Sequence, residues 1–131
     1  MLCADTSSMI AFIDGEPGQD VGLVSRALAD RSLVLAPVCV VELLSDPELT
    51  PSVEASILKV EVLEITPGYW ERAGRLRAKL LRQRFHPKLA DSLIAQSCLD
   101  HEVPLVTRDR DFSAFQKVAG LRVMLAEGRL Q

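Results

Sequence analysis

The chain has few of the residues that build a disulfide framework or a zinc site. It has only three cysteines, scattered through apolar runs, with no C-x-x-C motif and no cysteine–histidine zinc spacing: Cys3, Cys39 and Cys98. An odd, scattered set is typical of reduced, buried thiols in a cytosolic protein. A disulfide-rich secreted domain is therefore excluded, and a zinc module has no ligand set.

Long hydrophobic runs are also absent. Asp5 breaks the first apolar run, and no basic segment precedes it. No uninterrupted apolar stretch approaches the ~20 residues that a membrane span needs. We therefore expect a soluble, cytoplasmic protein with no membrane association.

An excess of positive charge is missing as well, because the formal net charge is -3. This balance does not indicate a nucleic-acid-binding protein as a strongly basic domain would. The basic residues are nevertheless unevenly placed, and seven of the fifteen fall in one short segment: Arg72, Arg75, Arg77, Lys79, Arg82, Arg84 and Lys88. Two interpretations remain open, a solvated helix face and a patch that holds phosphates.

What the sequence does contain is enough apolar material for one core. Of the 131 residues, 48% are hydrophobic, and no repeat, low-complexity tract or linker interrupts them. This size favours a single domain over residues 1–131.

Strand and helix signals alternate along that domain. The expected strands are 1–5, 32–37, 60–65, 103–107 and 121–125. The expected helices are 6–13 with hydroxyl caps at 6–8, 20–30, 37–46, 50–59, 66–84 capped by Thr66-Pro67, one from Pro87, and a short one within 108–115. Such alternation predicts right-handed crossovers and a mostly parallel sheet with helices on both faces.

Asp91 stands on an apolar stripe of one predicted helix. At about 100° per residue, Ile94 and Cys98 lie on one side of it and Ala95 on the other. A lone carboxylate costs roughly several kcal/mol to bury unless a cation or a hydrogen-bond donor meets it. The sequence therefore demands a partner for Asp91.

Further carboxylates stand where the predicted strands end. Asp5 ends the first strand, Asp109 and Asp111 follow the fourth, and Glu42 lies one turn into the helix after the second. Sites in open α/β sheets form beyond the carboxyl ends of the strands. If these acids converge with Asp91, they need a multivalent cation between them.

Ligation by oxygen alone favours a hard ion, Mg²⁺ or Mn²⁺. Such an ion can activate water and stabilise a phosphoryl group during cleavage, which is nuclease chemistry. Taken singly, each acid also has an ordinary role as a helix cap, a paired surface charge or part of a solvated loop.

Three segments of the chain resemble the PIN domain, and within it the VapC-type ribonuclease toxins of toxin–antitoxin pairs. They are "LCADTSSMIAFID", "VCVVELL" and "KLADSLIAQSCLDHEVPLVTRDRDF". The third is the most specific, with its A-D-x-L-I-A core and T-x-D-x-D-F run. The resemblance spans essentially the whole chain, and it implies a three-layer α/β/α sandwich with a mostly parallel, about five-stranded sheet.

The resemblance also implies an activity and its residues. The catalytic and metal-binding set would be Asp5, Glu42, Asp91 and Asp109, with Asp111 as a further ligand and Thr6 or Ser7 supporting the water shell. The protein would be a Mg²⁺- or Mn²⁺-dependent endoribonuclease, the toxin of a type II toxin–antitoxin system, and would cleave RNA by metal-activated water. Its partners would be RNA, a cognate antitoxin and a second copy in a homodimer. Relatives often place a hydroxyl near the start of the glutamate helix, where this chain has Ala36 and Cys39.

Two other functions share parts of this pattern. A phosphatase of the phosphoryl-transfer class needs D-x-D after the first strand, and a phospho-acceptor receiver needs paired acids there and a lysine after the last strand. Here Asp5 is followed by Thr6 and Ser7, so this class is disfavoured. A catalytically silent PIN-like binding module remains an alternative, although the intact acids favour activity.

Overall fold

The computed structural model describes residues 1–126. Residues 127–131, which the sequence prediction included in its single domain, lie outside the described part. The strands are β1 (Leu2–Ala4), β2 (Leu33–Leu35), β3 (Glu61–Val62), β4 (Leu105–Thr107) and β5 (Val123–Leu125). The helices are α1 (Thr6–Ile13), α2 (Gln19–Ala29), α3 (Pro37–Leu44), α4 (Pro51–Leu58), α5 (Tyr69–Arg82), α6 (Leu89–His101), the 3-10 turn η1 (Arg110–Phe112) and α7 (Ser113–Ala119).

The strands form one sheet in the order β3-β2-β1-β4-β5, and all four pairings are parallel. The predicted five-stranded parallel sheet is thereby confirmed. From β1 the chain builds outward to β2 and β3, and then returns to place β4 on the other side of β1. A strand order that reverses in this way opens a crevice at the carboxyl ends of the two strands, here β1 and β4.

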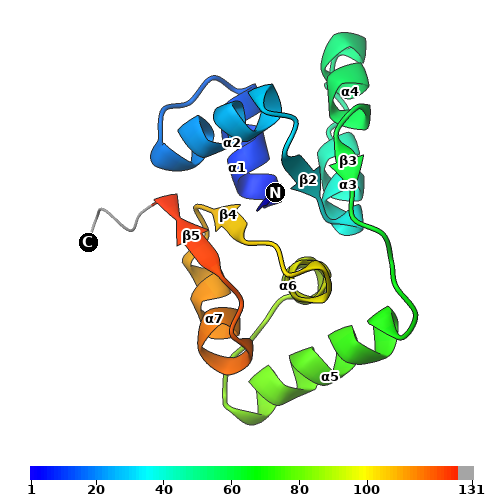
Figure 1. The fold of residues 1–131 in the computed structure, drawn as a ribbon, viewed down its shortest axis with the longest axis vertical. Coiled ribbons are helices and arrows are strands. Elements are labelled where there is room, and N and C mark those ends of the chain that lie inside the picture. The colour runs from blue at the N-terminus through cyan, green and yellow to red at the C-terminus, as the bar shows by residue number, and fades with distance from the viewer. Residues whose placement is uncertain (127–131) are drawn as a thin grey trace.

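Helices cover the sheet on both sides. In Figure 1, α1 and α2 lie on one side of the row of strands, and α5, α6 and α7 lie on the other. Because both faces are covered, the inner strands are apolar apart from Thr107 at the end of β4, and Val34, Leu35, Leu105 and Val106 are fully buried. The predicted three-layer sandwich is confirmed.

The three cysteines belong to this core. Cys3, Cys39 and Cys98 are buried and unbridged. Burial raises the pKa of the Cys39 thiol well above its usual value, so this thiol stays protonated. The expectation of reduced, buried cysteines is confirmed.

The longest helix, α5, carries most of the basic segment. Its buried side is a stripe of Tyr69, Ala73, Leu76 and Leu80, and the intervening basic residues face away from the core or lie at its border. Between residues 1 and 126 no helix has the length and apolar character to cross a membrane.

Two predicted helix starts are wrong. The N-cap of α5 is Gly68, in a left-handed conformation with φ of 83°, and not Thr66-Pro67. The Thr66 hydroxyl instead donates to Asp100, which belongs to α6. Helix α6 begins at Leu89 with Lys88 as its N-cap, two residues after the predicted start at Pro87.

Candidate metal centre

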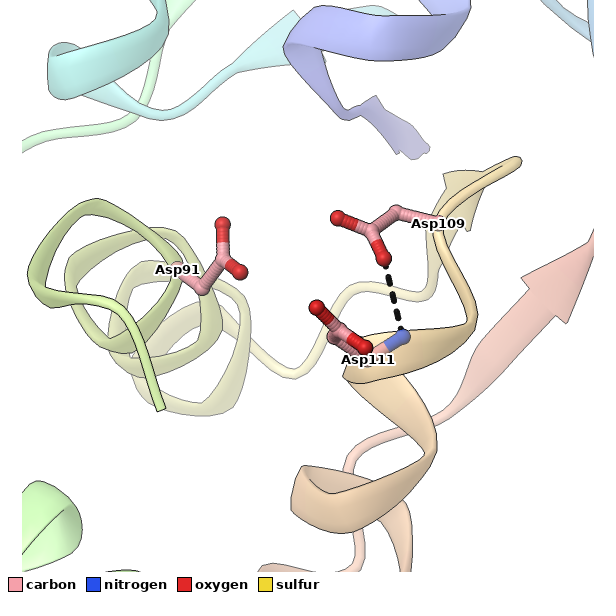
Figure 2. A group of neighbouring side chains, drawn as sticks. All are labelled: Asp91, Asp109 and Asp111. Atoms are coloured by element: carbon pink, nitrogen blue, oxygen red, sulfur yellow. Dashed lines mark hydrogen bonds between the residues drawn. The ribbon is translucent and has the colours of Figure 1, made fainter. Parts of the chain in front are cut away.

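Three acids converge at the crevice between β1 and β4. Asp91 comes from the first turn of α6, Asp109 follows β4, and Asp111 lies in η1. One carboxylate oxygen from each lies within 4.8 Å of the others. Figure 2 shows the three carboxyl groups facing one common space. We call this group the acid triad.

The backbone after β4 fixes two of these acids. The hydroxyl oxygen of Thr107 accepts a hydrogen bond from the backbone N–H of Asp109, with an N–O distance of 2.9 Å. Oδ1 of Asp109 in turn accepts the N–H of Asp111 at 2.9 Å, the dashed line in Figure 2. These two bonds close a tight turn, which aims both side chains at Asp91.

Asp5 lies beside the triad and is held by two hydroxyls. Its Oδ2 accepts hydrogen bonds from Ser7 at 2.7 Å and from Thr107 at 2.8 Å. Thr107 thus joins the end of β4 to the end of β1. The expectation that the hydroxyls of residues 6–8 cap α1 is wrong, because the N-cap is Asp5 and these hydroxyls bond to carboxylates.

Glu42 is exposed on α3 and is not a member of the triad. Thr6 donates its hydroxyl to Oε1 of Glu42 at 2.7 Å. The hydroxyl group that bonds to Glu42 thus comes from α1, at the residue next to Asp5.

The acids of this site repel one another. Burial, followed by the negative charges of Asp5 and Asp109, raises the pKa of Asp91 to about 7. Burial also raises the pKa of Asp5, although its hydrogen bonds from Ser7 and Thr107 oppose the shift. Lys88 opposes the shift of the Asp91 pKa only in part, and a cation bound among these acids would lower that pKa further.

Two other poorly exposed acids show the opposite behaviour. Burial works against the ionisation of Asp20, yet hydrogen bonds from Arg108 and Ser8 outweigh it and lower its pKa. Asp100 likewise has a lowered pKa, because Arg72 outweighs its desolvation. The fold thus pairs Asp20 and Asp100 with arginines, whereas Asp91 is opposed only in part, by the charge of Lys88.

A divalent cation is the species that fits this arrangement. The donors are carboxylate oxygens from three acids within reach of one ion, with no thiolate or imidazole among them. Hard cations prefer such oxygen donors. The raised pKa of Asp91 marks the charge that a cation would compensate.

A model of the PIN domain family matches residues 2–118. The chain belongs to the PIN-domain family. The match covers the acid triad and Asp5, and it confirms the resemblance drawn from the three sequence segments. No curated protein matches the chain in a sequence comparison.

Solved structures share the fold of this PIN domain at low identity. VapBC2 from Rickettsia felis, bound to a DNA fragment from its promoter, has a chain similar at a TM-score of 0.74 and 16% identity, covering 95% of this chain and 97% of that one. DNA-bound VapBC from Salmonella typhimurium gives 0.72 and 21%, with coverages of 94% and 96%. VapBC-5 of Mycobacterium tuberculosis, a member of the VapBC family of toxin–antitoxin systems, gives 0.66 and 22%, with the same coverages.

One ion pair beside the site was not predicted from the sequence. Arg108 stands between Thr107 and Asp109, and its guanidinium forks onto the carboxylate of Asp20 at 2.7 and 2.9 Å. Asp20 is fully buried in α2 and also accepts the hydroxyl of Ser8 at 2.8 Å. The buried pair therefore anchors the turn that carries Asp109.

A sequence signal for this pair did exist. Asp20, Val24 and Ala27 are spaced along one buried face of α2, so Asp20 is an acid on an apolar stripe. Asp91 gave the same signal on α6. This spacing predicts a buried acid whose charge must be compensated. It does not indicate whether the acid lies beside an arginine or beside further acids.

Proposed function

We propose that this PIN domain is a Mg²⁺- or Mn²⁺-dependent endoribonuclease that acts in the cytoplasm as the toxin of a type II toxin–antitoxin system. The observation that carries the proposal is the acid triad at the carboxyl ends of β1 and β4, with the pKa of Asp91 raised to about 7. Membership of the PIN-domain family supports it.

In this proposal the triad and Asp5 hold the ion. When bound, a divalent cation lowers the pKa of water and stabilises charge on a phosphoryl group. Ser7 and Thr107 fix the orientation of Asp5, and Arg108 fixes the turn that bears Asp109. Glu42, positioned by Thr6, would contribute a fifth carboxylate at the edge of the site.

The toxin role implies an antitoxin, and the chain offers a groove for one. An apolar groove of about 420 Å³ runs between α1 and α4, lined in part by Met9, Phe12, Val53 and Ile57. We propose that an apolar helix of the antitoxin lies there while a basic side chain enters the acidic site. The VapBC structures with this fold support a toxin–antitoxin assignment.

The ends of the RNA products test the reaction class. Attack of water at phosphorus with departure of the 3′-oxygen leaves a 5′-phosphate and a 3′-hydroxyl, and we expect these ends. A ribonuclease that attacks with the 2′-hydroxyl needs an acid–base pair and yields a cyclic phosphate. Of the histidines that could serve in such a pair, His101 contacts the carbonyl oxygen of Glu64 at 2.8 Å, and His86 lines a pocket together with Asp91. Because the two reactions leave different ends on the RNA, the product ends distinguish between them.

The measurement is mass spectrometry of fragments from a defined RNA. EDTA should stop the cleavage, and one 2′-deoxy substitution at the cut position should slow it only through weaker binding. Recovery of 2′,3′-cyclic phosphate ends would contradict the proposed chemistry. A protein that binds RNA and never cuts it, with Mg²⁺ or Mn²⁺ present, would be the silent binding module.

Asp109 should matter more than Asp111. Asp109 is half-buried, its N–H donates to the Thr107 hydroxyl, and its carboxylate accepts from the N–H of Asp111. Asp111 is exposed. We therefore expect Asp109→Ala to lose Mn²⁺ affinity roughly tenfold more than Asp111→Ala, within the 10–100-fold range of altered metal sites. Calorimetric titration with Mn²⁺ at limiting concentration gives both affinities, and equal or reversed losses would refute the ranking.

A further inference from the structure

A second pocket, of about 400 Å³, opens directly beside the acid triad. Asp91 and Asp111 form one wall of it. Arg84, His86 and Arg110 line other parts, so acidic and basic side chains face the same hollow. We call it the arginine pocket.

The arginines of this pocket keep their charge available. Arg84 and Arg110 are exposed, and neither forms an ion pair with another residue of the described chain. By contrast, Arg72 forms an ion pair with Asp100, and Arg108 forms one with Asp20. Two uncommitted guanidinium groups next to a metal-type acid cluster suit an anion that also approaches the cluster.

The remaining lining suits the rest of a nucleotide. Phe85 is half-buried and lines the pocket, as do the partly exposed Pro87 and Ala114. Flat apolar surface of this kind contacts bases and sugars, while arginines contact phosphates. Inorganic phosphate alone would leave that apolar wall unused.

We propose that the arginine pocket binds the nucleotide adjacent to the bond that is cut, with Arg84 and Arg110 on its backbone phosphate. This inference rests on the proposed function, because the acid triad must hold the neighbouring scissile phosphate. It also divides the basic segment: Arg84 binds substrate, and Arg72 serves the fold.

The backbone at Arg84 makes a clean test possible. Arg84 ends α5 in a left-handed conformation with φ of 70°, and its N–H bonds to Leu81 while that of Phe85 bonds to Leu80. This is the Schellman position that glycine prefers. Arg84→Gly therefore removes the guanidinium while suiting the backbone.

The chain supplies a matched control at Arg31. Arg31 ends α2 in the same motif, with φ of 59° and N–H bonds from Arg31 to Leu28 and from Ser32 to Ala27. It lies just before β2, at the end of the sheet where the strands begin, whereas the acid triad lies at the carboxyl ends of the strands. Arg31→Gly repeats the backbone change without touching the arginine pocket.

The experiment measures binding of a labelled 20-nucleotide RNA in EDTA, across a series of salt concentrations. For single strands the slope of log K against log[salt] changes by about 0.7 for each phosphate contact. We expect Arg84→Gly and Arg110→Gln each to reduce the slope by about that amount, and Arg31→Gly to leave it unchanged. Thermal unfolding should show midpoints for both glycine variants equal to or above that of the parent.

The outcomes separate the two proposals. Parent-like slopes in both pocket variants would overturn the arginine pocket as a nucleotide site, point to an acidic partner side chain as its occupant, and leave the proposed function standing. No salt-dependent RNA binding by the parent would overturn both. Calorimetry with Mn²⁺ should show unweakened metal affinity in the pocket variants, and a loss there would assign the arginines to the metal centre instead.

Discussion

Asp91→Asn should reduce metal-dependent RNA cleavage by on the order of 10²–10³-fold, the scale seen when a preorganised charge-stabilising group is removed. The substitution keeps the shape of the side chain and removes a charge that points into the acid triad. Purified protein, a defined RNA and saturating Mg²⁺ give the rate. Strong expression of the parent should also arrest growth, and expression of the variant should not.

The same substitution should change how stability depends on pH in EDTA. The pKa of Asp91 is about 7 in the folded chain, above the ordinary aspartate value of the unfolded chain. The folded state therefore holds this proton more tightly, and the resulting stabilisation, full below about pH 4, is lost as pH rises to about 7. Asp91→Asn should flatten that fall, and Mg²⁺ should restore stability to the parent most strongly at the alkaline end.

Asp30→Asn is the matched control, because Asp30 is an exposed aspartate at the end of α2. It should leave cleavage, growth arrest and the pH profile as in the parent. Cleavage by Asp91→Asn at the parental rate would remove Asp91 from the metal site.

Asp20→Asn should destabilise the fold far more than Asp91→Asn or Asp30→Asn. It leaves Arg108 facing a neutral amide in a site where Asp20 is fully buried. Breaking a fully buried ion pair from one side costs about 3–5 kcal/mol. Arg108 is 28% exposed and keeps its ion pair with Glu16, so we expect a smaller loss, of about 1–3 kcal/mol. Chemical denaturation at pH 7 measures the loss, and a change below about 1 kcal/mol would show that the pair contributes little.

A double variant separates pairing from packing. Arg108→Met alone leaves Asp20 as an uncompensated buried charge, whereas combined with Asp20→Asn it leaves none. The double variant should therefore lose less stability than the sum of the two single losses. The lowered pKa of Asp20 also sets the pH sign: its contribution is present near neutrality and is lost in acid, opposite to that of Asp91.

Strands and most helices were predictable because their signals are local. The run that became β2 is apolar along its whole length, that of β4 is apolar up to Thr107, and Pro37 marks the first turn of α3. The role of Thr66, which is not the cap of α5, was not predictable in this way. Its hydroxyl bonds to Asp100, a residue 34 positions away, which no local pattern reveals.

The candidate site shows the same limit. Asp20 and Asp91 carry one local signal, an acid among apolar neighbours on a helix. Their pKa values move in opposite directions, because tertiary structure brings Arg108 to the first and further acids to the second. Sequence periodicity identifies a buried acid. Only the tertiary structure determines whether its neighbours are positively or negatively charged.

The position of β1 between β2 and β4 also sets when the candidate metal site can form during synthesis. Cys3 pairs with Leu105, so the central strand waits for a neighbour that the ribosome makes only after β2, β3 and helices α1 to α6. Contacts so distant in sequence form late in folding. A nascent chain lacks Asp109, Asp111 and the Thr107 hydroxyl that holds Asp5 until that stage. Under the proposed function, each molecule would therefore be harmless through most of its own synthesis, an interval in which an antitoxin can already be present.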